Sequence, residues 1–446
     1  MKKNVVMAIL IAAMGCSLLG GCGVSKDAEE SQIEGGEKAQ EQKADSDGGT
    51  EITMLIAATD GSADGIKAVT EKAEEELGIR VEIEEVGTDA DNLVKTRLAS
   101  GDMADLVTYN SGSLLKALNP SEYFADLSEY EIVNDLDETY KETVTVDGAV
   151  YGIPTSSSSA MAVLYNKEKY EEYGLEIPKT WDHFIENCEV LKAAGETAVL
   201  GSFADIWTTQ FPFLGDYYNV VSENPDFTEK FEKGEVKYAQ TESTIASFQK
   251  CKDLVEYYNE DYLATTYNDA SDKLAMGDGC QWFISSTAVA NIAQLYDKET
   301  ADKIGIFGIP GEDAENSGVT VGEPVSFYVN KDTEQMEAIM EFLEFYISQE
   351  GIDTYTATQM VTGPLCVKNR TIAEEYQLQA VKDLQKYFDD GKVHVAQEFE
   401  CAVKGANCAA ICQEVGSGQT TAEEAAKKYD EDCYKQAVQL GLNWKN

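Results

Sequence analysis

A regular alternation of strand-like and helix-like segments between residues 52 and 110 constrains the fold most. The apolar run Ile52–Ala57 is typical of a buried strand, and the apolar positions after it recur at helical spacing up to Gly78, a residue suited to ending a helix. The pattern then predicts a strand at 81–83, a helix at 92–99 and a strand at 106–107. Strands and helices that alternate in this way indicate βαβ units and a parallel sheet.

The carboxyl ends of these strands predict one part of a ligand site. In open α/β sheets, ligands bind just outside the carboxyl ends of the strands. Four polar or aromatic residues follow the first and third predicted strands: Thr59, Asp60, Tyr109 and Asn110. We therefore expect these four residues to contact a ligand.

The segment 151–192 carries the most distinctive order of local signals. It begins with an extended stretch closed by Pro154, because the residue before a proline is pushed out of the helical region. The apolar run Ala160–Tyr165 predicts a buried strand, and a short polar helix should follow it. Thr180 is a suitable N-cap for a longer helix, with Trp181 on its apolar, core-facing side.

This order of pieces resembles the family 1 extracellular solute-binding proteins, the receptors of ABC sugar importers. Four motifs carry the resemblance: Tyr151-Gly152-Ile153-Pro154, Tyr165-Asn166-Lys167, Gly174-Leu175, and Pro178-Lys179-Thr180-Trp181-Asp182 with Phe184. Two further stretches are similar to family motifs: Leu98 to Asp102 with Asp105, and Leu274 to Gly277 with Gly279 and Trp282. The chain departs from the family pattern at Ala104, where a proline is usual. The resemblance implies an α/β, two-lobed, periplasmic-binding-protein-like fold of type II, with a hinge and a ligand cleft between the lobes.

The resemblance also implies a division of the chain after its first 50 residues. We expect the first lobe to contain residues 51–158 plus 309–326 and the second lobe residues 160–306 plus 328–446. Three crossings between the lobes would then form the hinge. A pair of lobes joined in this way suits hinge closure around a ligand.

The N-terminal 50 residues have the pattern of an export signal followed by a tether. Residues 1–21 combine a basic start with an apolar stretch, which is typical of a signal peptide. The stretch Leu19-Gly20-Gly21-Cys22 resembles a bacterial lipobox and implies cleavage before Cys22, lipid attachment to its thiol and an extracytoplasmic protein anchored to the cell membrane. The alternative is an ordinary secretory signal with an incidental cysteine. Residues 22–50 contain few large apolar side chains, which predicts a disordered tether.

Net charge and cysteine content narrow the partners. The formal charge of −46 excludes nucleic acid as a partner, because phosphate binding requires a basic surface. The acidity fits either a soluble surface or a site for a cationic ligand. Cysteines are scattered along the chain, unlike those of a small disulfide-stapled domain, and they leave open whether they are free or paired.

Four residues in the second half complete the predicted ligand site. A saccharide pocket combines aromatic walls with a few fixed polar groups. Trp207 and Trp282 are the candidates for stacking, and Asp205 and Glu323 are the candidates for hydrogen bonding. The competing interpretation of either tryptophan is a place in the core.

Sequence patterns of enzymes and metal sites are weak here. The chain has two histidines and lacks a nucleophile elbow, a P-loop and a dinucleotide fingerprint. Its many acidic residues form pairs by chance, so the sequence does not distinguish such pairs from the two catalytic carboxylates of a glycan hydrolase. Cys401, Cys408 and Cys412 near His394 could bind a metal or form a core face, and we predict no metal and no cofactor.

Together these observations predict a monomeric, lipid-anchored receptor that does no chemistry. The resemblance implies that it binds a mono- or oligosaccharide between its lobes and delivers it to the transmembrane subunits of an ABC permease. Two alternatives remain open from the sequence: a receptor for an amine or polyamine, and a surface glycan hydrolase.

Overall fold

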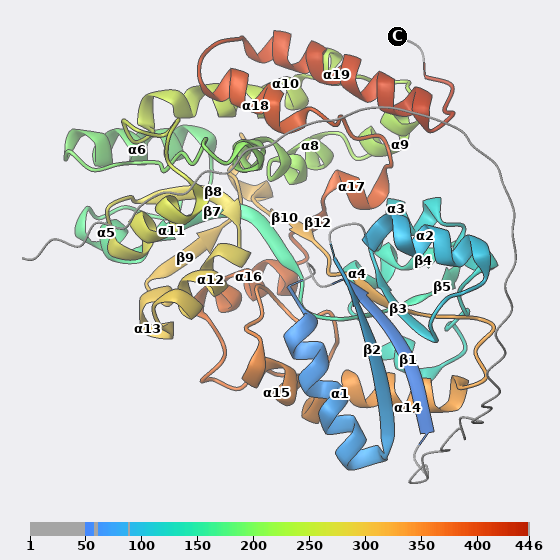
Figure 1. The fold of residues 1–446 in the computed structure, drawn as a ribbon. Helices are drawn as coiled ribbons and strands as arrows, with labels where there is room; N and C mark the ends of the chain where they lie inside the picture. Colours follow the sequence, from blue (N-terminus) through green and yellow to red (C-terminus); the bar gives the residue numbers. More distant parts are fainter. Residues whose placement is uncertain (1–49, 58–60, 88–89, 445–446) are drawn as a thin grey trace, which may run out of the picture. The chain divides into compact units, whose positions relative to one another are not determined.

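A computed structural model describes residues 50–57, 61–87 and 90–444 (Figure 1). The predicted signal peptide, Cys22 and the tether up to residue 49 lie outside the described residues, as do Thr59 and Asp60. Within the described part, none of the helices has the length and apolar character that crossing a membrane requires.

The first sheet has five strands in the order β2-β1-β3-β11-β6. β1 pairs in parallel with both β2 and β3, while β11 pairs antiparallel with β3 and β6. The bounds of these strands are β1 (Thr50–Ala57), β2 (Ile79–Val86), β3 (Leu106–Tyr109), β6 (Gly152–Pro154) and β11 (Ser326–Val329). The parallel βαβ units predicted from the sequence are confirmed.

Helix α1 (Ala63–Leu77) shows why this sequence pattern folds as it does. Its buried positions include Ile66, Val69 and Ala73, which lie on one face at helical spacing. Gly78 ends the helix in the left-handed conformation, with φ of 70°, and its N–H donates to the carbonyl of Glu74. The remaining elements on this side are α2 (Ala90–Ser100), α3 (Ser113–Ala117), η1 (Pro120–Glu122), η2 (Glu131–Asp135), α4 (Glu138–Thr143), α14 (Met336–Tyr346), α15 (Gln349–Thr358) and the two-stranded β4 (Thr145–Val146) and β5 (Ala149–Val150).

The second sheet is centred on β7 (Ser159–Asn166), the strand that the apolar run of the sequence predicts. The order is β12-β10-β7-β8, and β9 also pairs with β7. β7 is antiparallel to β8, β9 and β10, while β10 and β12 are parallel. The bounds of the other strands are β8 (Gln281–Ser285), β9 (Ile304–Phe307), β10 (Val319–Gly322) and β12 (Val393–Val395).

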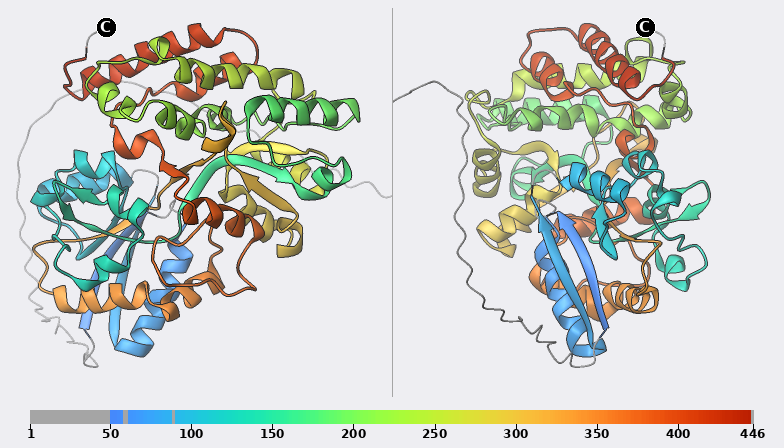
Figure 2. Two further views of the ribbon diagram at one scale, coloured as in Figure 1. Left: turned by 180° about the vertical axis from the view of Figure 1, so that it is seen from behind. Right: turned by 45° about the vertical axis from the view of Figure 1, so that its right-hand side comes forward.

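Helices make up most of the remainder of this half, seen from two further directions in Figure 2. Their bounds are α5 (Lys167–Glu172), α6 (Trp181–Ala193), η3 (Ile206–Gln210), α7 (Phe211–Leu214), α8 (Tyr217–Glu223), α9 (Phe227–Glu232), η4 (Tyr238–Gln240), α10 (Glu242–Asp253), η5 (Leu254–Tyr257), α11 (Tyr267–Met276), α12 (Thr287–Leu295), α13 (Lys298–Ala301), η6 (Ala314–Asn316), α16 (Gln379–Asp389), α17 (Gln397–Glu400), α18 (Cys408–Gly416) and α19 (Ala422–Gln439).

Helix α6 confirms the predicted cap and core face. The Thr180 side chain accepts a hydrogen bond from the backbone N–H of His183, as an N-cap residue should. Trp181 is buried and stacks on Phe184 with ring centroids 4.9 Å apart. By contrast, the N-cap residue of α14, Gln335, makes no side-chain cap bond.

Three connections join the two sheets, between β6 and β7, between β10 and β11, and between α15 and α16. The strand order corrects the predicted assignment of the second crossing. β10 belongs to the second sheet and β11 to the first, whereas the sequence placed 309–326 in the first lobe and 328–446 in the second. The helices α14 and α15 also pack against α1 of the first half. A short apolar strand looks the same in either sheet, so only pairing partners decide its membership.

The described cysteines are all free and buried: Cys188, Cys251, Cys280, Cys366, Cys401, Cys408, Cys412 and Cys433. Several of them lie in the apolar core shared by α10, α18 and α19. Cys401 directly follows α17, whereas Cys408 and Cys412 lie on α18, so the three do not share one helix. Among the residues that the structure describes, no cluster of histidine, cysteine and acidic side chains could hold a metal ion.

Candidate ligand-binding site

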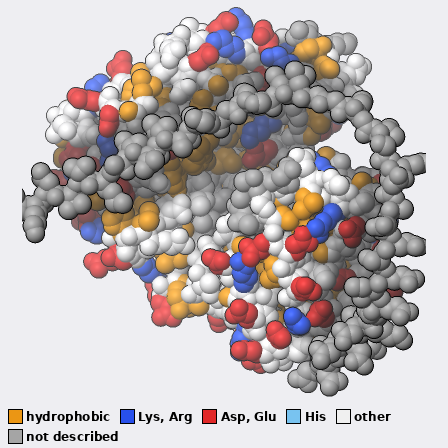
Figure 3. Space-filling model, in the orientation of Figure 1, with side chains coloured by type: hydrophobic (Ala, Val, Ile, Leu, Met, Phe, Trp, Pro, Cys, Tyr) orange, Lys and Arg blue, Asp and Glu red, His pale blue; other side chains and the backbone are white. Residues whose placement is uncertain are grey.

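A cavity of about 300 Å³ lies where the three connections between the sheets meet. Its lining includes Gly61 and Ser62 at the start of α1 and four residues of α12 between 287 and 294. All three connections contribute to the lining, through 155–159, 323–325 and 359–362. Its volume lies at the lower end of the range of small-molecule sites. The space-filling view shows the molecule hollowed between the half that carries α10 and α19 and the half that carries α1 and α14 (Figure 3).

Hydroxyl and amide side chains dominate the lining of this cavity. They come from both halves of the molecule: Ser62, Thr155, Ser156, Ser157, Ser159, Thr287, Asn291, Gln294, Tyr355, Gln359 and Thr362. Such groups donate and accept hydrogen bonds without carrying charge. The cavity therefore suits a ligand with many hydroxyl groups.

The serine run at the first connection is partly structural. The Ser157 hydroxyl accepts from the backbone N–H of Thr362, and the Ser158 hydroxyl donates to a carboxylate oxygen of Glu323 at 2.8 Å. These bonds tie the first connection to the third and to the second. Ser156 and Ser159 are only half-buried and line the cavity, where the Ser156 hydroxyl accepts from the Tyr355 hydroxyl and the Ser159 hydroxyl donates to the Gly322 carbonyl.

Glu323 is the only charged residue among the described residues that line the cavity. Its Oε2 also accepts from the Cys366 thiol at 3.4 Å, and its Oε1 is buried without a hydrogen-bond partner among the described residues. Burial raises the pKa of this carboxyl from 4.5 to about 7, with smaller opposing effects from the Ser158 and Cys366 hydrogen bonds. The predicted site residue Glu323 is therefore at the cavity, in a partly desolvated environment.

An aromatic group adjoins the cavity through Asn291. The Asn291 amide donates to the Tyr267 hydroxyl at 2.7 Å, and the Tyr267 ring lies 5.3 Å from the ring of Trp207. Trp207 is 44% exposed, which leaves part of its indole surface free. Exposed tryptophan next to hydroxyl and amide groups is the combination that stacks on the C–H face of a sugar. Trp207 itself does not line the cavity, and its ligand contact stays a prediction.

Trp282 does not fit the stacking role predicted for it. It is 1% exposed on the central part of β8, and its Nε1 donates to the Ser202 hydroxyl at 3.2 Å. Its ring lies 5.2 Å from that of Tyr267. The strand β8 pairs with β7, and the Trp282 side chain is buried in the core, where it packs against the ring of Tyr267. The competing core interpretation of this tryptophan is the correct one.

The other predicted residues that the structure describes do not line the cavity. Tyr109 is 4% exposed, and its hydroxyl donates to the Asp91 carboxylate. Asn110 is exposed, and its backbone carbonyl accepts from the Tyr328 hydroxyl. Asp205 is half-buried and accepts from the backbone N–H of Tyr267 at 2.7 Å, which fixes the start of α11. Tyr109 is thus a core residue, and Asp205 positions the aromatic group.

Sequence reasoning missed Thr287, Asn291 and Tyr267. Asn291 and Tyr267 lie in the helices α12 and α11. Their positions in the sequence are equally compatible with an exposed and with a buried side chain, so no local pattern marks them as site residues. They become part of a site only because α11 and α12 pack against each other.

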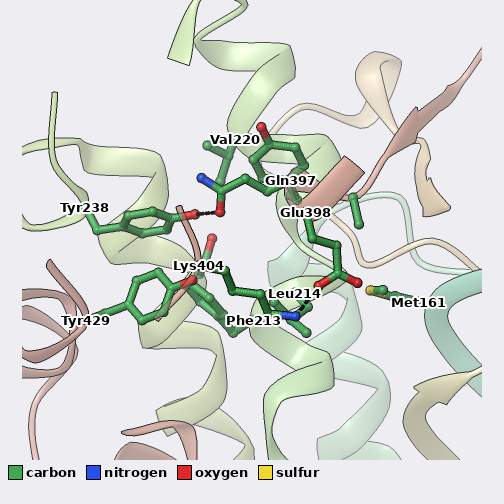
Figure 4. Close-up of a pocket in the computed structure, with 12 residues that line it drawn as sticks. Met161, Phe213, Leu214, Val220, Tyr238, Gln397, Glu398, Lys404 and Tyr429 are labelled. Carbon is green, nitrogen blue, oxygen red and sulfur yellow. Dashed lines mark hydrogen bonds and ion pairs between the residues drawn. The ribbon is translucent and has the colours of Figure 1, made fainter. Parts of the chain in front are cut away.

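A second small cavity lies beside α17 (Figure 4). Aromatic rings of Phe213, Tyr238 and Tyr429 surround it, the Tyr238 hydroxyl donates to Gln397, and Glu398 pairs with Lys404. Its volume of about 20 Å³ holds roughly one water molecule. It is therefore too small for a saccharide.

Comparison with known proteins identifies the family. Residues 59–352 match the model of the family described as bacterial extracellular solute-binding protein. This match spans more than half of the chain, so the chain belongs to that family. It is an extracytoplasmic solute-binding protein and not an enzyme.

Individual relatives are distant. The multiple sugar-binding protein of Streptococcus mutans serotype c is 23% identical over 287 residues, covering 60% of this chain and 64% of that protein. The chain thus aligns with slightly less than two thirds of that relative. The melibiose/raffinose/stachyose-binding protein MelE of Bacillus subtilis is 22% identical over 364 residues, covering 79% of this chain and 83% of that protein.

A solved structure confirms the fold. The binding protein MsmE of Bacillus subtilis, in an open conformation, superposes with a TM-score of 0.74 and covers 88% of this chain and 99% of that one. At 17% identity this likeness supports the fold alone. The predicted two-lobed α/β solute-receptor fold is confirmed.

Proposed function

We propose that this protein is a carbohydrate receptor that binds a mono- or oligosaccharide in the cavity between its two sheets. The observation that carries the proposal is the cavity lining, in which hydroxyl and amide groups from both halves meet, and Asn291 of this lining connects through Tyr267 to the exposed ring of Trp207. The hydroxyl groups of a neutral sugar can exchange hydrogen bonds with the hydroxyl and amide groups of such a lining. Thr59 and Asp60, which follow β1 in the sequence, stay predicted ligand contacts, whereas Asn110 after β3 does not line this cavity.

The names of the relatives agree with this ligand class. The two proteins described above are named for sugars, and one of them for melibiose, raffinose and stachyose. We infer that the ligand of this chain is also a saccharide, with its length and linkage left to experiment.

Delivery to an ABC importer completes the proposal. The receptor would close around its ligand and present it to permease subunits, and Cys22 would carry the lipid that keeps it at the membrane. Binding itself does no chemistry; it shifts the equilibrium between open and closed arrangements by preferring one of them. Metabolic labelling of the expressed protein with a palmitate analogue tests the anchor, and a Cys22→Ala variant should lose the label.

Thermal unfolding of the full chain against a sugar panel tests the ligand class. Melibiose, raffinose, stachyose and their monosaccharides form the first set. A sugar at about 100 times its dissociation constant should raise the free energy of unfolding by roughly 2.7 kcal/mol. Recovery of the sugar unchanged after incubation is the second readout. A panel without any stabilising sugar would contradict the proposal.

Glu323 and the net charge of −46 favour one second candidate, a cationic ligand such as an amine or polyamine. Putrescine, spermidine and simple amino sugars therefore belong in the same panel. Stabilisation by the polyamines without the sugars would replace the carbohydrate assignment. A glycan hydrolase has no such support, because hydrolysis requires two facing carboxyl groups and Glu323 is the only carboxyl in the described lining.

A further inference from the structure

Glu323 occupies the point where the three connections between the sheets touch. It follows β10 on the second connection. Ser158 belongs to the first connection and Cys366 to the third, and both donate to Glu323 Oε2. The hydroxyl of Ser158 and the thiol of Cys366 are themselves 3.4 Å apart. One carboxyl group thus links all three chain segments that must move when the two halves move.

The surroundings of this carboxyl disfavour its ionised form. Oε1 has no partner among the described residues, and none of the described cavity-lining residues is basic. The titratable groups that face it are the Cys366 thiol and, on α4 and its N-cap, Tyr140 and Asp137. Cys366 and Tyr140 are themselves fully buried groups whose pKa values are raised, and the Asp137 carboxylate raises the pKa of Glu323 further. Among the described residues, neither the groups that shift the pKa of Glu323 nor the cavity lining supplies a cation that compensates a negative charge at this point.

A ligand in the cavity would deepen this effect. Glu323 lines the cavity and is 8% exposed, but its Oε1 is buried, so water in the cavity solvates the carboxyl through the cavity wall and not by direct contact. A neutral sugar that displaces this water removes solvation and favours the protonated carboxyl. An ammonium group in the same place would favour the carboxylate instead.

We propose that Glu323 couples ligand binding to proton uptake, so that a neutral saccharide binds together with a proton on the carboxyl that joins the three connections. This inference rests on the proposed carbohydrate function and adds the charge class of the ligand to it. The balance is simple: ionised receptor, sugar and one proton from solvent give the sugar complex with a neutral Glu323.

Calorimetric titration measures the coupling directly. Binding of a sugar from the panel, for example raffinose, is titrated at pH 7.5 in two buffers with different ionisation enthalpies. The dependence of the observed enthalpy on the buffer gives the number of protons taken up. We expect uptake of a substantial fraction of one proton, and an affinity that weakens by up to about tenfold per pH unit above neutrality.

Two variants separate this coupling from a general loss of stability. Glu323→Gln keeps the shape of the neutral acid, so it should bind without proton uptake and with an affinity that does not change with pH. Asp430→Asn changes another buried carboxyl, on α19, whose oxygens accept from the backbone N–H groups of Tyr238 and Ala239. It lies outside the cavity lining, and it should retain the proton uptake of the original protein.

The outcomes are distinct. Proton uptake that disappears in Glu323→Gln and persists in Asp430→Asn supports the inference. Sugar binding without proton exchange, or exchange that Glu323→Gln leaves intact, overturns the inference and leaves the carbohydrate function standing. Proton release on binding of glucosamine but no binding of neutral sugars overturns both. Failure of the protein to bind any member of the panel does the same.

Discussion

At the scale of single residues, the two tryptophans that look alike in the sequence have different surroundings. Trp207 lies on the short helix η3 with nearly half of its surface exposed, while Trp282 lies in a paired strand with almost none. Solvent exposure decides which of them can meet a ligand. The consequence can be measured with one matched pair of variants.

Trp207→Ala should weaken sugar binding while changing the stability of the fold by less than about 1 kcal/mol. Loss of an exposed aromatic contact typically costs about 2 kcal/mol of binding, roughly a 30-fold increase in Kd. Trp282→Ala should instead lower the free energy of unfolding by about 3–5 kcal/mol, because it leaves a large cavity in the core. Urea unfolding and calorimetric titration of both variants check the pair. Equal effects of the two substitutions on stability would contradict the assignment.

Glu323 should also make the stability of the ligand-free protein depend on pH. Its pKa is about 7 in the fold and near 4.5 in the unfolded chain, so the folded state binds more protons between these values. The contribution is fully present below about pH 4.5 and is lost as the pH rises through 7, with a total of about 3 kcal/mol.

Urea unfolding of the original protein and of Glu323→Gln at pH 5, 6, 7 and 8 measures this contribution. Other carboxyl groups titrate in both proteins, so the difference between the two curves isolates Glu323. As the pH rises, the free energy of unfolding of the original protein should fall relative to that of the glutamine variant. Parallel curves would show that this carboxyl is not perturbed in the fold.

At the scale of single elements, local signals in the sequence predict helices well where a cap and an apolar face agree. The helix α6 begins at the predicted threonine, and α19 begins at Thr421, whose side chain accepts from the N–H of Glu424. The helix α14 has an apolar face, but its N-cap residue Gln335 makes no side-chain cap bond. Caps depend on a single side-chain rotamer, whereas an apolar face is repeated over several turns.

Thr180→Ala should lower the free energy of unfolding by about 1 kcal/mol, because the N–H of His183 loses its side-chain acceptor. Thr180→Ser keeps a hydroxyl at the same place and serves as the control, with an expected change of a few tenths of a kcal/mol. Denaturant unfolding measures both. A serine variant as unstable as the alanine variant would show that the methyl group, and not the cap, stabilises this position.

At the scale of the whole molecule, α3 and α17 join the two halves outside the connections, as α4 and β12 also do. The Ser113 hydroxyl at the start of α3 donates to the backbone carbonyl of Glu398 on α17 at 2.5 Å. Gly112, with φ of 67°, lies so close to α17 that an added Cβ would be 2.5 Å from the Cα and carbonyl oxygen of Phe399. Backbone atoms cannot yield as a flexible side chain can.

Gly112→Ala should therefore separate α3 from α17. The loss in free energy of unfolding should exceed the cost of placing an alanine at a positive φ angle. Gly101→Ala is the matched control, since Gly101 has φ of 72° and a Cβ there would meet no atom within 4 Å. We expect about 1 kcal/mol for Gly101→Ala and at least about 2 kcal/mol more for Gly112→Ala. Denaturant unfolding gives these values, and equal costs would mean that the contact with α17 contributes nothing.

The sequence by itself determined the fold class, the parallel start of the first sheet, the strand β7 and the helix α6. These features depend on periodicity, glycine and proline positions and caps, which are properties of neighbouring residues. The likeness of ordered motifs to a receptor family added the two lobes. Of the predicted site residues, Glu323 lines the cavity and Trp207 lies near it, and both stand out from periodic faces as an acid beside a crossing strand and an aromatic in an irregular loop.

Only the tertiary structure decided which sheet each crossing strand joins, and which polar residues face one cavity. β10 and β11 are both short and apolar, so hydrogen-bonding partners far away in the sequence determine their places. Trp282 and Tyr109 are buried by neighbours from other elements, and Asn291 reaches the site because α12 lies beside α11. Burial and convergence depend on contacts between distant segments, which a local pattern of residues does not encode.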